Sequence, residues 1–178
     1  MVPSMLRYYA NDKCSDYIAI PKVSSQRRKY IPMELISKEV IAGDKIFLMP
    51  NSDVFSFGIL ESKVHMAWTK RFCGRLKSDF SYSSQIVYNT FPWPEATDVQ
   101  RCTIEKTAQS IIDARNKYVN ASLADLYNPD NEWMYPELMK AHEENDKAVM
   151  DAYGFDLNMT ESDIVAELCK MYEQITNR

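Results

Sequence analysis

The chain has 178 residues, of which 46% are hydrophobic and 26% charged, with a formal net charge of −4 at pH 7. This composition is ordinary for a globular protein with a sizeable core, and 4 glycines do not suit a low-complexity disordered chain. No apolar run approaches the roughly 18 residues of a membrane span. Residues 1–10 lack the apolar centre of a signal peptide. We therefore expect a cytoplasmic protein with no membrane partner.

The first half of the chain predicts a mixture of strands and helices. Residues 17–20 are typical of a short strand that Pro21 ends or places at a sheet edge, and residues 22–29 predict a polar loop. Residues 40–42 and 45–49 flank a Gly-Asp pair. They predict either two strands around a turn or one strand with a bulge.

A helical region is predicted next. Asp53 is a suitable N-cap, and apolar residues from Phe55 to Trp68 recur at helical spacing. We expect a break near Ser62 and an end at Gly74. Residues 86–88 predict another strand, and the Phe-Pro-Trp-Pro run at 91–94 predicts a rigid, packed exit from it.

The second half predicts helices almost throughout. A Thr-x-x-Gln capping box opens the first helix, and Pro136 and Gly154 suit the first turn and the C-terminal cap of a later one. The predicted helices cover residues 97–118, 122–127, 136–153 and 160–175. Together these patterns predict an α+β fold: a small mixed α/β domain over residues 1–94, followed by an α-helical C-terminal bundle over residues 95–178.

The two predicted domains carry opposite charge. Residues 1–94 hold 13 Lys/Arg and 8 Asp/Glu, a net charge of +5. Residues 95–178 hold 8 and 17, a net charge of −9, and the two halves together give the −4 of the whole chain. This asymmetry indicates a surface for a polyanion on an acidic support. The alternative is two unrelated solvated faces.

No catalytic or metal-binding pattern is found in the sequence. The four cysteines lie far apart, and neither histidine has a second ligand at the spacing of a metal site. Cys73 and His65 are eight residues apart on a predicted helix, about 12 Å of rise, which does not suit a nucleophile and its base. A Gly-rich phosphate loop, a nucleophile elbow and a His-Glu-x-x-His motif are all missing. We expect no catalytic residue, no metal and no cofactor in this chain.

Two basic, hydroxyl-rich segments are the candidate binding residues. Lysine and arginine bind phosphates, hydroxyls fix register, and charged or amide side chains read base edges. The first segment contains Lys22, Ser24, Ser25, Arg27, Arg28 and Lys29; the second contains Lys70, Arg71, Arg75, Lys77 and Ser78, and is extended by Asp79, Tyr82 and Ser83. If the two segments converge, they form a DNA-binding surface. The alternative is that both are solubilising loops.

The chain also resembles a known family: the C-terminal part of single-chain restriction–modification DNA methyltransferases of the Type IIL-like class. The resemblance extends from about Tyr17 to Gly154. It is carried by residues 17–25, 28–32 and 57–60, by Ser62, His65, Met66 and Trp68, by residues 73–79, 82–83 and 88–94, and by residues 123–127, 141–142 and 153–154. In that class, a target recognition domain and a helical tail follow an adenine-N6 methyltransferase domain.

The resemblance implies that residues 1–94 are a DNA target recognition domain, with His65 added to the candidate DNA contacts. The family's Gly-rich S-adenosylmethionine loop, Asn-Pro-Pro-Tyr/Phe motif and nuclease motif are missing, and Asn128-Pro129 is followed by Asp130. We therefore expect a fragment that begins within the recognition domain and neither methylates nor cuts DNA. Its partners would be double-stranded DNA and the parent's methyltransferase domain, which would use S-adenosylmethionine and flip out an adenine. The alternative is a protein-interaction or scaffold module that docks through its acidic helices.

Overall fold

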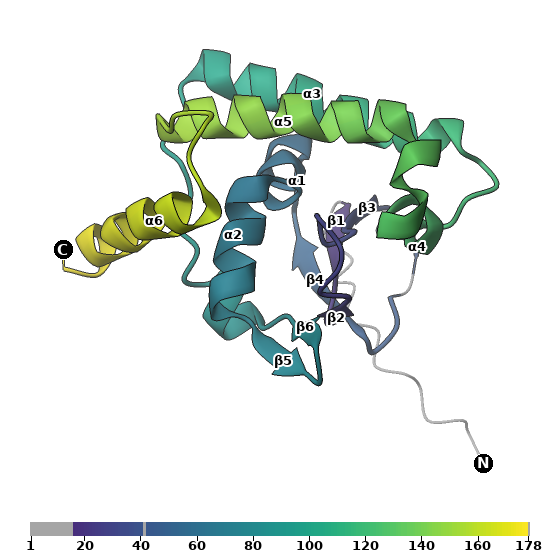
Figure 1. The fold of residues 1–178 in the computed structure, drawn as a ribbon, viewed down its shortest axis with the longest axis horizontal. Coiled ribbons are helices and arrows are strands. Elements are labelled where there is room, and N and C mark those ends of the chain that lie inside the picture. The colour runs from purple at the N-terminus through teal and green to yellow at the C-terminus, as the bar shows by residue number, and fades with distance from the viewer. Residues whose placement is uncertain (1–15, 41, 178) are drawn as a thin grey trace.

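The computed structural model describes residues 16–40 and 42–177. The predictions for residues 1–10, for Cys14 and for Ile41 lie outside this described part. Two small antiparallel sheets lie below two long helices, α3 (Asp98–Lys117) and α5 (Pro136–Tyr153), which run side by side across the top (Figure 1). The predicted α+β fold is confirmed.

The first sheet has the strand order β3-β1-β4. Its strands are β1 (Tyr17–Pro21), β3 (Glu34–Ile36) and β4 (Ile46–Pro50). The strand predicted at residues 17–20 is confirmed, and all four of these residues are buried. The strand predicted at residues 40–42 is wrong at its described positions, since Val40 lies in a bend and Ala42 is irregular. Instead, β1 pairs with β3, which is too short to show periodicity in the sequence.

The second sheet has the order β2-β6-β5. Its strands are β2 (Val23–Ser24), β5 (Gly74–Leu76) and β6 (Asp79–Ser81). The polar loop predicted at residues 22–29 therefore contributes a short strand. The sequence predicted that Gly74 ends the preceding helix. Instead Cys73 is the C-cap of that helix, and Gly74 begins β5.

Helices α1 (Val54–Leu60) and α2 (Lys63–Phe72) confirm the predicted helical region and its break. The Asp53 carboxylate accepts a hydrogen bond from the Ser56 amide at 2.8 Å, and the Ser62 hydroxyl accepts one from the His65 amide at 3.3 Å. Each side chain satisfies an amide that the first helical turn leaves unpaired. Glu61 ends α1, and Ser62 then starts α2.

The strand predicted at residues 86–88 is wrong, because this segment is the π-helical turn η1 (Ser84–Tyr88). The Ser83 hydroxyl caps the turn at the Ile86 amide, 3.3 Å away. From α2, the Trp68 indole N–H donates to the Val87 carbonyl at 3.2 Å. A local serine cap and a tertiary hydrogen bond thus outweigh the β-propensity of Ile, Val and Tyr. The exit at 91–94 is packed as predicted, with Phe91 buried and 5.8 Å from the Trp93 ring.

The helices of the second half follow the prediction closely. They are α3 (Asp98–Lys117), α4 (Leu123–Leu126), α5 (Pro136–Tyr153) and α6 (Glu161–Thr176), with the unpredicted 3₁₀-helix η2 (Pro129–Met134) between α4 and α5. Thr97 and Gln100 form the predicted capping box. Gly154 closes α5 in the left-handed region, at φ 67°.

Both halves of the chain contribute to a single core. Ile18 and Phe57 from the first half and Ile104 and Leu138 from the second are fully buried in one cluster. α1 packs closely on α3, where a Cβ at Gly58 would lie 2.8 Å from the Ile104 Cγ2 atom. The first half is therefore joined to the helical half by direct packing of its helices, mainly α1 on α3.

Candidate nucleic-acid interface

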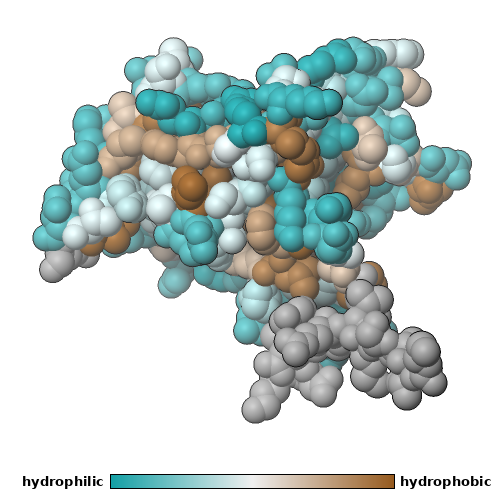
Figure 2. Space-filling view, turned by 90° about the horizontal axis from the view of Figure 1, so that it is seen from below, coloured by the Kyte–Doolittle hydropathy of each residue, from teal (hydrophilic) through white to brown (hydrophobic). Residues whose placement is uncertain are grey.

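The two basic segments of the sequence meet in the second sheet. Val23 pairs with Ser81 and Ser24 with Phe80, so the first segment lies along β6. Just after β2, the backbone N–H of Gln26 donates to the carboxylate of Asp79, the first residue of β6, at 3.3 Å. Residues more than fifty positions apart thus form one surface. The face that carries the β-strands mixes hydrophilic residues with scattered hydrophobic ones (Figure 2).

The β5–β6 hairpin projects its charged side chains into solvent. Its turn is Lys77-Ser78, and Arg75, Lys77 and Ser78 are all exposed. Lys77 has a φ of 56°, a conformation that costs a residue with a Cβ about 1–2 kcal/mol. The Arg75 guanidinium lies 4.4 Å from the Phe80 ring centre and donates to the Ser78 carbonyl at 3.2 Å. The hairpin therefore presents positive charge on a defined scaffold.

The other candidate cations differ in whether their side chains already form hydrogen bonds or ion pairs. Lys22 donates to the Asp44 carbonyl at 2.7 Å, and Arg27 and Lys29 form ion pairs with carboxylates of the helical half. No hydrogen bond, ion pair or ring contact involves the side chain of Arg28 or Lys77 within the described ranges. Those two cations are the ones available for a ligand without breaking an existing contact.

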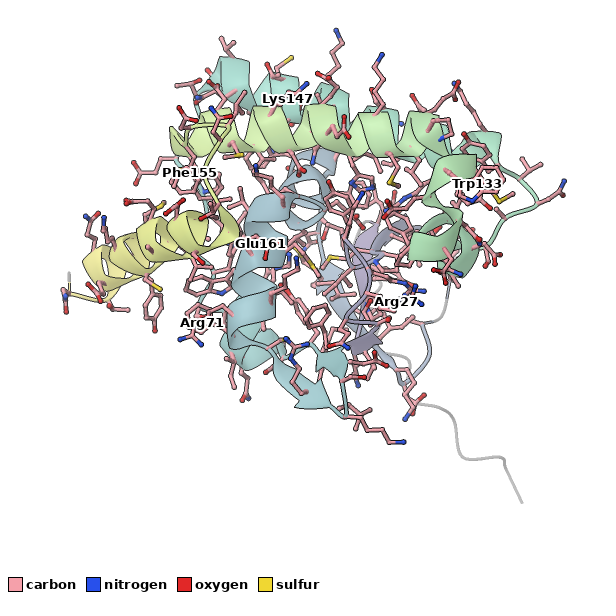
Figure 3. The ribbon with its side chains drawn as sticks, in the orientation of Figure 1. Arg27, Arg71, Trp133, Lys147, Phe155 and Glu161 are labelled. Atoms are coloured by element: carbon pink, nitrogen blue, oxygen red, sulfur yellow. The ribbon has the colours of Figure 1, made fainter. Side chains whose placement is uncertain are left out.

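The cations at the end of α2 lie apart from this set. Lys70 pairs with Glu161 at the start of α6, and the Arg71 guanidinium lies 5.7 Å from the neighbouring Phe72 ring (Figure 3). The structure thus uses Lys70 to join α2 to α6.

Three of the predicted contact residues are buried in the free chain. His65 is 1% exposed, Tyr82 4% and Ser24 3%. The His65 ring bridges the Leu60 carbonyl from Nδ1 and the Tyr82 hydroxyl from Nε2, both at 3.0 Å. Burial lowers the pKa of His65 to about 4, so the ring is neutral at pH 7, and its Nδ1–H group donates a hydrogen bond to the Leu60 carbonyl. His65 and Tyr82 join α2 to the end of β6. They support the β5–β6 hairpin from the side of the core.

The remaining hydroxyls shape the local backbone. Ser25 Oγ accepts a hydrogen bond from the Arg27 amide at 3.3 Å, and Ser83 caps η1. Both are partly exposed. Such turns position the neighbouring charged side chains.

A buried ion pair that we did not predict joins the two halves beneath this surface. Glu61, at the α1–α2 junction, accepts from the Arg115 guanidinium at 2.9 Å and from the Met33 amide at 2.6 Å. The side chain of Glu61 is 0% exposed and that of Arg115 is 8% exposed. Burial raises the pKa of Glu61, and the guanidinium opposes that rise. The signal in the sequence was Arg115 itself, which falls on the apolar face of its helix.

Aromatic and histidine side chains extend the same network. The Tyr127 hydroxyl lies 2.6 Å from His142 Nε2, and the Tyr30 ring stacks on His142 with centres 4.1 Å apart. The Tyr30 hydroxyl donates to Asp146 at 2.8 Å. Burial lowers the pKa of His142 and raises that of Asp146 to about 6. Tyr30 follows the first basic segment directly, so the network anchors that segment to α5.

The described residues contain no group of three or more His, Cys, Asp or Glu side chains that would hold a metal ion. Within those same ranges, no helix is both long and apolar enough to cross a membrane. The meeting of the two basic segments defines a class: a binding module with a basic hairpin face carried on a helical bundle.

Comparison with known proteins assigns this module to a family. The chain belongs to the MmeI family: residues 2–95 match the MmeI target recognition domain, and residues 96–178 match the MmeI C-terminal domain. The resemblance noted in the sequence is thereby confirmed.

Two similar proteins are much longer than this chain, and the chain matches only part of each. DNA methyltransferase A of Bacillus subtilis (strain 168) is 38% identical over 161 residues, which cover 90% of this chain and 18% of that protein. A solved structure of the Type IIL restriction-modification enzyme MmeI in complex with DNA is 40% identical, with a TM-score of 0.87. The match covers 92% of this chain and 22% of that one. The chain therefore spans about a fifth of the length of these relatives.

Proposed function

We propose that this chain recognises the sequence of duplex DNA as part of a restriction–modification methyltransferase. The observation that carries the proposal is the joining of the two basic segments through β2, β6 and the Gln26–Asp79 hydrogen bond. The family assignment and the DNA-bound relative support it. Residues 1–94 would act as the recognition domain and residues 95–178 as its helical support.

The structure divides the candidate contacts by chemistry. Arg28, Arg75 and Lys77 supply positive charge for phosphates or base acceptors, and Asp79 supplies an acceptor beside them. Lys22, Ser25, Ser78 and Ser83 line the same region and remain candidates. The buried His65, Tyr82 and Ser24 act from beneath.

We place catalysis in another part of the longer protein. That part would transfer a methyl group from S-adenosylmethionine to adenine N6, and an endonuclease would be a further part. Among the described residues, Gly58 is packed against Ile104 and Ala108 inside the helical layer, so this glycine forms no cradle for that cofactor. The role of this chain is to bind and orient DNA.

Duplex binding at several salt concentrations tests the proposal. We expect the variant with Arg28→Gln, Arg75→Gln and Lys77→Gln to bind more weakly, with the slope of log K against log salt smaller by up to roughly 3, about 0.9 for each lost phosphate contact. Lys147→Gln is the matched control, because Lys147 lies on α5 and pairs with Glu144, away from the hairpin (Figure 3). An unchanged affinity and slope in the triple variant would contradict DNA recognition by this face.

A second function, docking to the methyltransferase domain, is favoured by one observation. Trp133 and Met134 of η2 are neighbours in the sequence and are 78% and 48% exposed, so together they offer apolar surface to a partner. Co-purification with a separately produced methyltransferase domain tests this function. Loss of association on changing Trp133 to Ser, or on reversing the charges of Glu143 and Glu144, would support it. The absence of any association would count against it.

A further inference from the structure

Two ion pairs join the first basic segment to the helical half. The Arg27 guanidinium lies 2.5 Å from the Asp130 carboxylate, and the Lys29 ammonium lies 2.6 Å from that of Glu132. Both pairs span 103 positions of the chain. Two cations two residues apart thus meet two anions two residues apart, which makes a two-point clasp.

The anions of this clasp sit on an element with little other anchoring. η2 buries none of its own residues, and its flanking residues Tyr127 and Tyr135 are buried. The Asn128 side chain accepts from the Asp130 amide at 3.1 Å and starts the helix. Local capping therefore presents the carboxylates, and the clasp, whose Arg27 and Lys29 side chains are largely exposed, links η2 to the recognition segment.

The segment is also held from its other sides. The Gln26 amide bonds to Asp79 of the hairpin, and the Tyr30 hydroxyl bonds to Asp146 of α5. The Arg28 amide donates to the Ser25 carbonyl at 3.2 Å. Along residues 26–30, the Arg28 side chain is the cation that no described residue engages.

We propose that Asp130 and Glu132 are positioning residues for DNA recognition. They keep Arg27 and Lys29 paired in both the free and the DNA-bound chain, so Arg28 is the cation of this segment that contacts a phosphate. The inference rests on the proposed function and reassigns two of its predicted contacts. Arg27 and Lys29 then release no DNA counterions, because protein carboxylates already neutralise them.

The salt dependence of duplex binding separates positioning residues from contact residues. We expect Arg28→Gln to reduce the slope of log K against log salt by about 0.9. Arg27→Gln and Lys29→Gln should weaken binding while leaving the slope at the value of the unmodified chain. A slope loss of about 0.9 in either of these variants would overturn the inference, since that cation would then be exchanging its carboxylate for a phosphate.

A charge swap gives a second, independent test. Arg27→Asp places two anions together and should weaken binding, and adding Asp130→Arg should restore affinity to within about twofold of the unmodified chain, because the pair is rebuilt in reverse. Affinity that stays as low as in Arg27→Asp alone would show that DNA needs the cation itself. Asp130→Asn with Glu132→Gln should speed amide hydrogen exchange at residues 26–30, and unchanged exchange would also overturn the clasp. If the unmodified chain binds no DNA, the proposed function fails, while the exchange result still reports on the clasp alone.

Discussion

Arg115 offers the sharpest test of how the helical half supports the recognition surface. Its guanidinium binds the Glu61 carboxylate, the Met33 carbonyl and the Tyr127 hydroxyl, and it lies 5.2 Å from the Phe57 ring centre. Arg115→Met keeps much of the volume and removes all of these polar contacts. It leaves the carboxylate of Glu61 buried without its cation.

The size of the effect follows from burial. Removing one member of a buried ion pair costs about 3–5 kcal/mol of unfolding free energy, because the other charge stays uncompensated. Arg101→Met on the same helix is the matched control: that side chain is 45% exposed and pairs with Asp53 and Glu105, so its loss should cost less than about 1 kcal/mol.

Urea unfolding of a double-mutant cycle measures both predictions. Adding Glu61→Gln to Arg115→Met removes the stranded charge, so the double variant should be more stable than the sum of the single effects indicates, by about 2 kcal/mol. Additive effects would refute the reasoning. So would an Arg115→Met variant that is no less stable than Arg101→Met.

Three further predictions concern pH, packing and backbone strain. The pKa of Asp146, raised by burial to about 6 from its ordinary 3.8, means that the folded chain holds this proton more tightly than the unfolded chain. The contribution of Asp146 to the unfolding free energy should therefore fall by up to about 3 kcal/mol between about pH 4 and about pH 6, measured as the difference between urea titrations of the unmodified chain and of Asp146→Asn. Gly58→Ala should cost about 1–3 kcal/mol in thermal unfolding because its Cβ would press on α3, whereas Gly43→Ala, with no atom within 4 Å, should be nearly neutral. Lys77→Gly should relieve the positive φ and stabilise the chain by up to about 1 kcal/mol, while weakening duplex binding in the salt titration; binding that stays equally tight would show that Lys77 makes no contact.

Local chemistry explains which elements could be predicted. The capping residues Asp53, Ser62 and Thr97 each act within three positions of themselves, so their sequence patterns locate helix starts directly. Gly154 closes α5 for the same reason. The strand predicted at residues 86–88 failed because the Val87 carbonyl bonds to Trp68, a partner from another element.

The sequence predicted which residue types make up the candidate site, but it predicted only some of their solvent exposures correctly. Both basic segments do meet, which their shared polar character indicated. His65 and Tyr82 carry side chains that suit a binding surface, yet they satisfy each other inside the core. The sequence indicated phosphate contacts at Arg27 and Lys29. It could not show their ion pairs, because each carboxylate partner lies 103 positions away in the chain.

The sequence by itself determined the helical second half, the opposite charges of the two halves and the family, because these depend on local spacing, composition and matching residues. Only the tertiary structure decided which charged side chains face solvent and which form ion pairs between the two halves. The pairs Glu61–Arg115, Arg27–Asp130 and Lys29–Glu132 each join the two halves of the chain. Burial and pairing depend on what the fold brings into contact, and so the same residue type serves as a structural anchor at Arg115 and has no ion-pair partner among the described residues at Arg28.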